Sequence, residues 1–274
     1  MQKTNNKNES SVMRSIRDAF TPQREINKKT YTIIGVISFV LLIAIWQGIT
    51  VTGLVNSTFM PTPLKTIKAG YDLFAKNDYI SDIWITVWRV LLGFIISVVI
   101  AVPIGILIGT YTPIEAFIEP IMSFLRYLPV TAFIPLFILW IGIDESEKIA
   151  VIIFGSLPQL ILMVAVDTRK VSNDLVEVAY TLGTSRAEVI WKVIFPSALP
   201  SIIDSLRMVL GWSWTYVTVA EMIGASSGMG YMIIQSQRMI NVGNIFVGIL
   251  VIGIIGLIFD YCFKGLSRLL FPWK

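Results

Sequence analysis

The sequence contains no histidine and only one cysteine, Cys262. Ser-His-Asp catalytic triads and histidine-based metal sites need an imidazole, so both are excluded. A single cysteine can form neither an intrachain disulfide nor a cysteine-cluster metal site. Charged residues are also scarce, at 15% of the chain against about 25% in ordinary soluble domains. Because the chain has no histidine and only one cysteine, we expect no metal ion, and we expect no other cofactor.

The chain also lacks the lysine-containing phosphate loop G-x-x-x-x-G-K-[ST]. Without that loop it has no lysine to hold the phosphates of ATP, so it cannot itself be an ATPase. The glycine-rich segment 224–230 has neither the lysine nor a preceding strand. It predicts a close-packed outer turn that contacts a second copy or an external protein.

Hydrophobic residues make up 55% of the 274 residues, an excess that requires lipid around much of the surface. Six apolar segments are each long enough to cross about 30 Å of hydrocarbon. They lie at about 31–51, 83–110, 114–141, 148–166, 202–224 and 244–263. The predicted fold is an all-α polytopic membrane protein with six transmembrane helices and both ends on one side.

The segments outside these spans predict the domain organisation. Residues 1–30 are polar and basic, and we expect a tail with a partly amphipathic patch at 12–20 that either lies on the membrane surface or is disordered. Residues 31–274 are expected to form the transmembrane domain, with no cleaved signal peptide. Pro61 and Pro63 predict a short helix at 64–75 on the outer surface.

A polar segment, residues 168–200, separates two of the long apolar runs. Apolar residues at three- and four-residue spacing predict a short amphipathic helix: Leu175, Val176, Ala179 and Leu182. Gly183 ends this helix, and Ser185 with Glu188 forms a capping box that begins a second one. Pro196 and Pro200 are expected to end or bend the second helix. The segment therefore predicts a helix, a sharp turn and a second helix that can transmit force from a docked partner.

The distribution of basic residues predicts the orientation of the chain. With the N-terminus inside, fourteen lysines and arginines lie on inner segments and five on outer segments. This positive-inside bias places both termini and the 168–200 loop in the cytoplasm.

Ionisable residues at membrane depth are costly and therefore mark functional candidates. Arg126 precedes Pro129 and Pro135, which interrupt helical hydrogen bonding and favour a cavity wall. Arg126 could meet an anionic solute there, or it could extend toward the inner headgroups or pair with Glu115 or Glu119. Arg89 is expected to have a structural role, either extending toward the outer headgroups or pairing with a carboxylate, and Arg207 and Asp204, one turn apart, are expected to pair with each other.

The fifth span is the richest in aromatic and hydroxyl side chains. Trp214, Thr218 and Glu221 recur at four- and three-residue spacing and so share one helical face. We predict that this face lines a translocation path or its outer gate; the alternative is helix packing around a buried glutamate pair.

The spacing from Glu177 through Ala179 and Gly183 to Pro196 resembles the cytoplasmic EAA loop of bacterial binding-protein-dependent ABC importer permeases. Three positions depart from the usual motif by apolar substitutions: Val178, Val193 and Phe195. Segments 86–94, 135–143 and 220–230 look like permeases of the nitrate, sulfonate, taurine and bicarbonate branch. The resemblance covers the chain from about Met60 to its end.

The resemblance implies a fold, partners and a function. The implied fold is that of a type I ABC importer permease. Such a permease works as a homodimer, so the first implied partner is a second copy of this chain. The other implied partners are ATP-binding subunits in the cytoplasm and an extracytoplasmic solute-binding protein. It implies no nucleic-acid partner and a location in the bacterial inner membrane, in contact with lipid. The implied ATPase-coupling positions are Glu177, Ala179, Gly183, Ser185 and Arg186.

The implied function is a permease subunit, not an enzyme, that imports a small anion by alternating access. Nitrate is the first choice of solute, with sulfonate, taurine and bicarbonate close behind. An ion-coupled secondary transporter is the alternative, with Asp204, Glu221 and Asp260 as its coupling residues. A membrane enzyme would need a cluster of catalytic residues at one depth, and the carboxylates are scattered instead.

Overall fold

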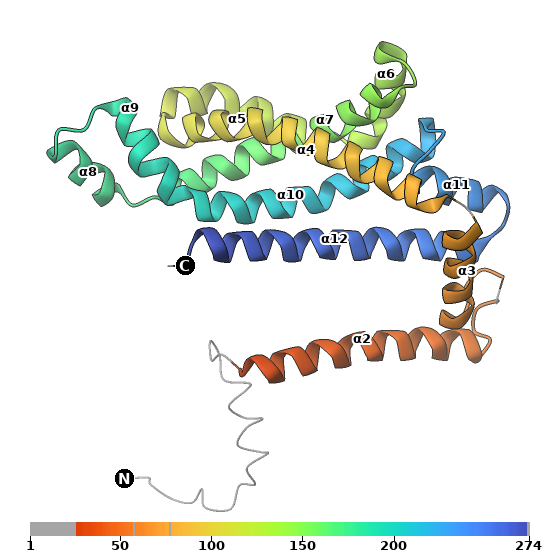
Figure 1. Ribbon diagram of the computed structural model, residues 1–274. Helices are drawn as coiled ribbons and strands as arrows, with labels where there is room; N and C mark the ends of the chain where they lie inside the picture. The colour runs from red at the N-terminus through yellow and green to blue at the C-terminus, as the bar shows by residue number, and fades with distance from the viewer. Residues whose placement is uncertain (1–25, 57, 77, 273–274) are drawn as a thin grey trace, which may run out of the picture. The chain divides into compact units, whose positions relative to one another are not determined.

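The computed structural model describes residues 26–56, 58–76 and 78–272, and every regular element in these ranges is a helix (Figure 1). The amphipathic patch predicted at 12–20 lies outside the described residues. The chain divides into two compact units, residues 1–64 and 65–274. The first unit contributes α2 (Lys28–Val51), which begins where the Asn27 side chain accepts a hydrogen bond from the Lys29 amide. No residue of α2 is buried within the chain, so its apolar surface needs lipid or another protein around it.

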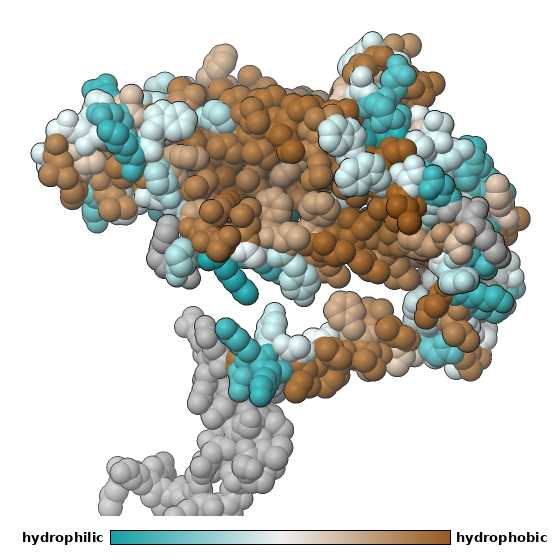
Figure 2. Space-filling model, viewed as in Figure 1, coloured by the Kyte–Doolittle hydropathy of each residue, from teal (hydrophilic) through white to brown (hydrophobic). Residues whose placement is uncertain are grey.

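The remaining helices form the 65–274 unit and supply its core. Their bounds are α3 (Pro63–Lys76), α4 (Tyr79–Thr110), α5 (Thr112–Tyr127), α6 (Val130–Ile141), α7 (Glu145–Arg169), α8 (Asn173–Thr181), α9 (Arg186–Val189), the π-helical turn η1 (Ile190–Ile194), α10 (Phe195–Gly224), α11 (Met229–Arg238) and α12 (Val242–Leu270). In Figure 2 hydrophobic side chains cover the middle of this unit, and hydrophilic ones gather toward its two ends. We call the end that carries α8 and α9 the loop end, and the other the opposite end.

The helices confirm the prediction of a polytopic membrane protein. Five helical stretches among the described residues are long and apolar enough to cross a membrane: α2, α4, α7, the run 186–224 and α12. The sixth predicted span, 114–141, is a bent pair, because α5 and α6 meet at an angle of 95°. The break falls at Leu128 and Pro129, where the proline supplies no amide and pushes its neighbour into an extended conformation. Pro135, the other expected break, lies inside α6 without ending it.

The core of the unit is the packing of α4 against α7. Small residues four positions apart line the contacting side of α4: Gly93, Ser97, Ala101, Gly105 and Gly109. Rows of small residues let two helix backbones approach closely in a membrane. The approach is tight at Gly105, where an added Cβ would lie 2.6 Å from Cβ of Val164 and 2.8 Å from the Ile161 carbonyl oxygen.

Replacing Gly105 with alanine is therefore expected to destabilise the protein. Backbone and a β-branched side chain are the obstructing groups, so α4 and α7 must move apart, at a cost of about 1–3 kcal/mol for overpacking. The matched control is Gly265→Ala in α12, where an added Cβ meets nothing within 4 Å. SDS-induced unfolding in mixed micelles measures both; equal unfolding midpoints would contradict the close approach.

Candidate functional site

The 168–200 segment folds into the predicted pair of helices joined by a sharp turn. Gly183 follows α8 with φ +82°, a left-handed conformation that favours glycine. The Gly183 amide donates to the Tyr180 carbonyl over 2.9 Å, and the Thr184 amide donates to the Ala179 carbonyl over 3.1 Å. These two hydrogen bonds are the pair found in a Schellman motif, so the turn closes the helix with its carbonyls satisfied.

The second helix begins with the predicted capping box. The Ser185 side chain accepts from the Glu188 amide, and the Ser185 amide donates to Glu188 Oε2 over 3.1 Å. Glu188 also forms an ion pair of 2.7 Å with Lys192. Hydrogen bonds from Lys192 and Ser185 lower the pKa of Glu188 to about 2, so its carboxylate is charged at neutral pH. These residues precede the apolar part of the 186–224 run.

Pro196 and Pro200 were expected to end or bend the second helix. They do not end it, because helical structure continues from Arg186 to Gly224, but the run changes direction between α9 and the long part of α10 (Figure 1). The π-helical turn η1 immediately precedes Phe195, whose amide donates to the Ile190 carbonyl, five residues back. A π turn accommodates one additional residue. This wider turn gives the proline ring space, which a regular α-helix lacks, and α10 runs on through Pro196 and Pro200.

The two helices present an apolar surface away from the bundle. Of the predicted apolar stripe on α8, Ala179 is buried, whereas Leu175 and Leu182 are exposed. Val178 is exposed beside them, and Glu177 is exposed without a hydrogen-bonding partner among the described residues. Exposed apolar side chains around a carboxylate suit a protein partner better than water.

A buried ion-pair cluster joins four helices at the opposite end. Arg89 on α4 is 1% exposed and contacts Glu221 on α10, which is fully buried, over 2.8 Å. The same guanidinium donates to Glu145 at the start of α7 over 2.6 Å and to the Ser227 carbonyl over 2.9 Å. Of the two structural roles expected for Arg89, the structure shows the ion pair, with partners that sequence reasoning did not name. Arg207, which was expected to pair with Asp204, pairs with Asp260 instead, over 3.3 Å.

The cluster also fixes the turn that leads into α11. Glu221 accepts hydrogen bonds from the Thr86 hydroxyl and the Gly230 amide, both 2.8 Å long. Asp82 accepts from the Gly228 amide over 2.7 Å. Gly228 has φ +110°, which favours glycine at this position. The glycine-rich segment is thus held by carboxylates of α4 and α10.

The three residues predicted to share one face of the fifth span have different surroundings. Glu221 belongs to the ion-pair cluster. Trp214 and Thr218 line a groove between α10 and α12 of about 390 Å³, which also includes Gly253 and Gly256. The Trp214 ring packs against Phe259 at 5.6 Å between ring centroids.

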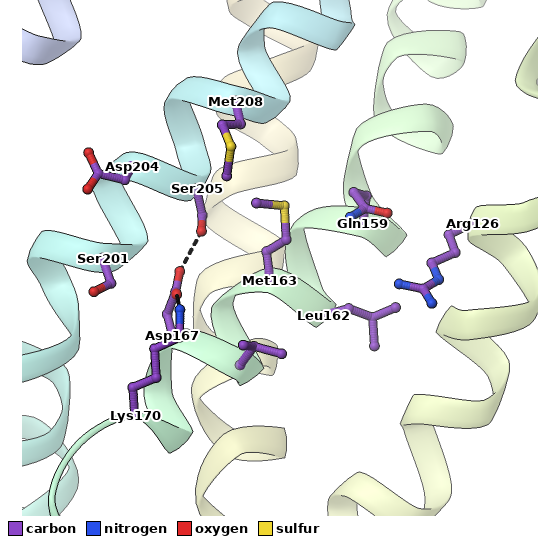
Figure 3. A pocket seen from close by; sticks show the side chains of 11 residues that line it. Arg126, Gln159, Leu162, Met163, Asp167, Lys170, Ser201, Asp204, Ser205 and Met208 are labelled. Atoms are coloured by element: carbon purple, nitrogen blue, oxygen red, sulfur yellow. Dashed lines mark hydrogen bonds and ion pairs between the residues drawn. The ribbon is translucent and has the colours of Figure 1, made fainter. Parts of the chain in front are cut away.

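Arg126 lines a separate cavity of about 320 Å³ between α5, α7 and α10 (Figure 3). Its wall consists of Arg126, Gln159, Leu162, Met163, Val166, Asp167, Lys170, Ser201, Asp204, Ser205 and Met208. In Figure 3 Arg126 lies across the cavity from the hydrogen bond that Ser205 donates to Asp167. Lys170 pairs with Asp167 over 2.8 Å.

The cavity contains polar side chains that sequence reasoning missed. Gln159, Asp167 and Lys170 recur on one side of α7, and Ser201 and Ser205 recur on α10. Their three-, four- and eight-residue spacing, across the ends of the spans predicted at 148–166 and 202–224, was the available signal. It was missed because Lys170 was assigned to the loop and the other side chains lie on two helices whose packing the sequence did not predict.

Arg126 is exposed although it lies in the middle of the bundle. It faces Gln159 and Leu162, which are near the centre of α7. The guanidinium stacks on the Tyr127 ring at 4.9 Å and donates to its hydroxyl over 3.1 Å. The carboxylates of Glu115 and Glu119 bind Arg169 instead, at 2.7 Å and 3.4 Å.

Comparison with known families decides the class of protein. Residues 101–274 match the family described as the binding-protein-dependent transport system inner membrane component. The chain belongs to this family of ABC importer permeases. The prediction that it is a permease subunit rather than an enzyme is confirmed, and the family implies separate ATP-binding subunits and a solute-binding protein.

Three relatives of this permease are named for particular solutes. SsuC of Bacillus subtilis, named for aliphatic sulfonates transport, is 35% identical over 88% of this chain and 87% of its own. The taurine permease TauC of Escherichia coli is 29% identical over 85% and 86%. The nitrate import permease NrtB of Synechocystis is 25% identical over 86% and 88%.

The fold also has a counterpart among solved structures. An inward-facing structure of the MetNI methionine ABC transporter aligns with a TM-score of 0.65, over 70% of this chain and 95% of that one, at 18% identity. This likeness confirms the predicted type I importer permease fold.

Proposed function

We propose that this permease imports small organosulfonates, working as a pair of identical subunits driven by a cytoplasmic ATPase pair. Nitrate was the first choice from sequence alone. The relatives named for sulfonates and taurine, at 35% and 29% identity, are more similar than the nitrate permease at 25%. We therefore rank a sulfonate group above nitrate and bicarbonate.

The exposed guanidinium of Arg126 at the middle of the bundle is the observation that carries this proposal. A charged side chain at that depth is too costly to face lipid, so it faces a wet cavity or a second copy. An arginine there offers paired N–H donors that match the oxygens of a sulfonate. The cavity of Figure 3 thus forms one wall of the translocation path, and the second copy supplies the other.

We propose that the ATPase docks on the 168–200 loop, where Glu177 is exposed on α8, Ala179 is buried beneath it and Gly183 forms the turn. Ser185 and Arg186 begin the helix that continues as α10, so movement of the loop reaches the cavity wall directly. To shift inward-facing to outward-facing populations from 1:99 to 99:1, the ATP-bound state must favour one form by roughly 5.5 kcal/mol. In a dimer, the two coupling loops would together supply this free energy.

Replacing Arg126 with glutamine tests the path. ATP-dependent uptake of labelled taurine and of an alkanesulfonate into proteoliposomes, with the ATPase and binding protein supplied, is expected to fall about 10- to 100-fold, because a charge-assisted hydrogen bond is worth roughly 1.5–3 kcal/mol. Arg268→Gln, a change near the end of α12, is the control and should leave uptake unchanged. Unchanged uptake in Arg126→Gln would remove Arg126 from the path, and uptake of nitrate alone would reject the sulfonate class.

An ion-coupled transporter would move solute without any ATPase. Its candidate residues lie apart: Asp260 pairs with Arg207 over 3.3 Å and with Lys264 over 2.6 Å, Glu221 belongs to the ion-pair cluster, and Asp204 lines the cavity. This separation favours the ATP-driven mechanism. Uptake that persists without the ATPase subunits would reverse that preference.

A further inference from the structure

Helix α3 has three distinct faces rather than two. Thr66 and Leu73 are buried on the side that packs against the unit. Lys65, Lys68 and Asp72 share a second side, which borders a hollow of about 400 Å³ together with Asn241 and Asn244. Ile67, Tyr71 and Phe74 recur at four- and three-residue spacing on a third side and are exposed.

The third face is unusual because two of its apolar residues are largely uncovered by the residues that the structure describes. Ile67 is 70% exposed and Tyr71 is 73% exposed. A charged face and an exposed apolar face on one short helix are typical of helices that lie in the membrane interface.

The position of α3 relative to the spans agrees with that location. Gly70 faces the first turns of α12, where a Cβ added to it would lie 3.5 Å from Cγ2 of Val247. Figure 1 shows α3 running across the end of α12 rather than along it. If α12 crosses the bilayer, α3 therefore lies along the bilayer surface at the opposite end of the unit.

Exposed tryptophans lie near the start of α4, the helix that follows α3. The Phe74 ring packs edge-on against Tyr79, the first residue of α4, at 5.2 Å between centroids. Trp84 and Trp88 follow within the first three turns of α4 and are both exposed. Tryptophan is enriched where membrane meets water. The exposed face of α3 continues this aromatic boundary.

We propose that α3 is an interfacial helix: Ile67, Tyr71 and Phe74 insert into the lipid leaflet at the opposite end of the bundle. Lys68 and the Asn244 amide remain in the headgroup layer, where a lipid phosphate can meet the lysine. The helix anchors the opposite ends of α4 and α12 at a fixed depth. This inference does not depend on the solute or on the ATPase.

Spin labels on single cysteines test the insertion. The full-length protein carries Cys262→Ser together with Ile67→Cys, Tyr71→Cys or, as the matched control on the charged face, Lys68→Cys. All three positions are exposed, so a label leaves the packing intact. In proteoliposomes, collision with oxygen and with a water-soluble nickel chelate reports the depth of each label.

Labels at 67 and 71 are expected to favour oxygen over the nickel chelate and to lie about 5–10 Å below the headgroup boundary. The label at 68 is expected to show the reverse preference. Equal chelate access at all three positions would overturn the proposal. So would dipolar broadening at 67 and 71, which would mean that a second copy covers the face, or shielding that appears only after a solute-binding protein is added.

Discussion

Replacing Arg89 with methionine is expected to lower the free energy of unfolding by about 3–5 kcal/mol, the range for breaking a buried ion pair from one side. The change leaves the fully buried Glu221 carboxylate without its cation. It also removes the donor to the Ser227 carbonyl, so the turn into α11 loses one of its hydrogen bonds to α4, while the bond from the Gly228 amide to Asp82 remains. SDS-induced unfolding in mixed micelles, followed by tryptophan fluorescence, measures the loss.

A double variant that also replaces Glu221 tests this ion pair more directly. Arg89→Met combined with Glu221→Gln removes both charges while the amide oxygen can still accept from the Thr86 hydroxyl or the Gly230 amide. The double variant is expected to recover part of the lost stability, because the uncompensated charge is gone. Arg238→Met, an exposed cation on α11, should change stability by no more than about 0.5 kcal/mol. An Arg89→Met protein as stable as Arg238→Met would refute the structural importance of the cluster.

Replacing Glu177 with alanine is expected to reduce ATP-dependent uptake about 5- to 150-fold, the range expected when a coupling free energy of roughly 1–3 kcal/mol is lost. Glu177 is exposed and has no partner among the described residues, so folding should not change. ATP hydrolysis by the complex and solute uptake are measured together in proteoliposomes. The expected signature is hydrolysis that continues without matching uptake.

A second variant in the same loop tests whether the loop couples the ATPase to transport. Gly183→Ala meets no atom within 4 Å, so its whole cost arises from the left-handed backbone, about 1–2 kcal/mol for an L-residue. This cost loosens the turn between α8 and α9 and should also uncouple transport. Asp174→Asn, in the first turn of α8, is the control that should transport normally. Coupled transport at the normal rate by both Glu177→Ala and Gly183→Ala would reject the loop as the coupling site.

Local signals predicted the loop and the membrane spans well. A glycine stop at Gly183 and the capping box of Ser185 and Glu188 depend on residues within four positions, so the sequence determines them directly. The break at Pro129 is local for the same reason. The change of direction near Pro196 and Pro200 was expected for the same reason, whereas the π-helical turn η1, which lets the helix continue past Pro196, has no signal in the sequence.

Pairings between distant helices could not be predicted in this way. Arg89 and Glu221 are 132 residues apart, and their contact depends on how α4 and α10 pack. Periodicity placed Trp214, Thr218 and Glu221 on one side of a helix but said nothing about the neighbours. Arg89 draws Glu221 into the cluster, whereas α12 covers Trp214.

The length of α10 has a mechanical consequence. Its 30 residues correspond to about 45 Å of helix at 1.5 Å per residue, with η1 and the 168–200 loop at one end and the Arg89 cluster at the other. Tilting this helix by about 10° around one end carries the other end through about 8 Å. On the proposed mechanism, a modest swing imposed at the loop therefore becomes a displacement of several ångströms at the far side of the bundle.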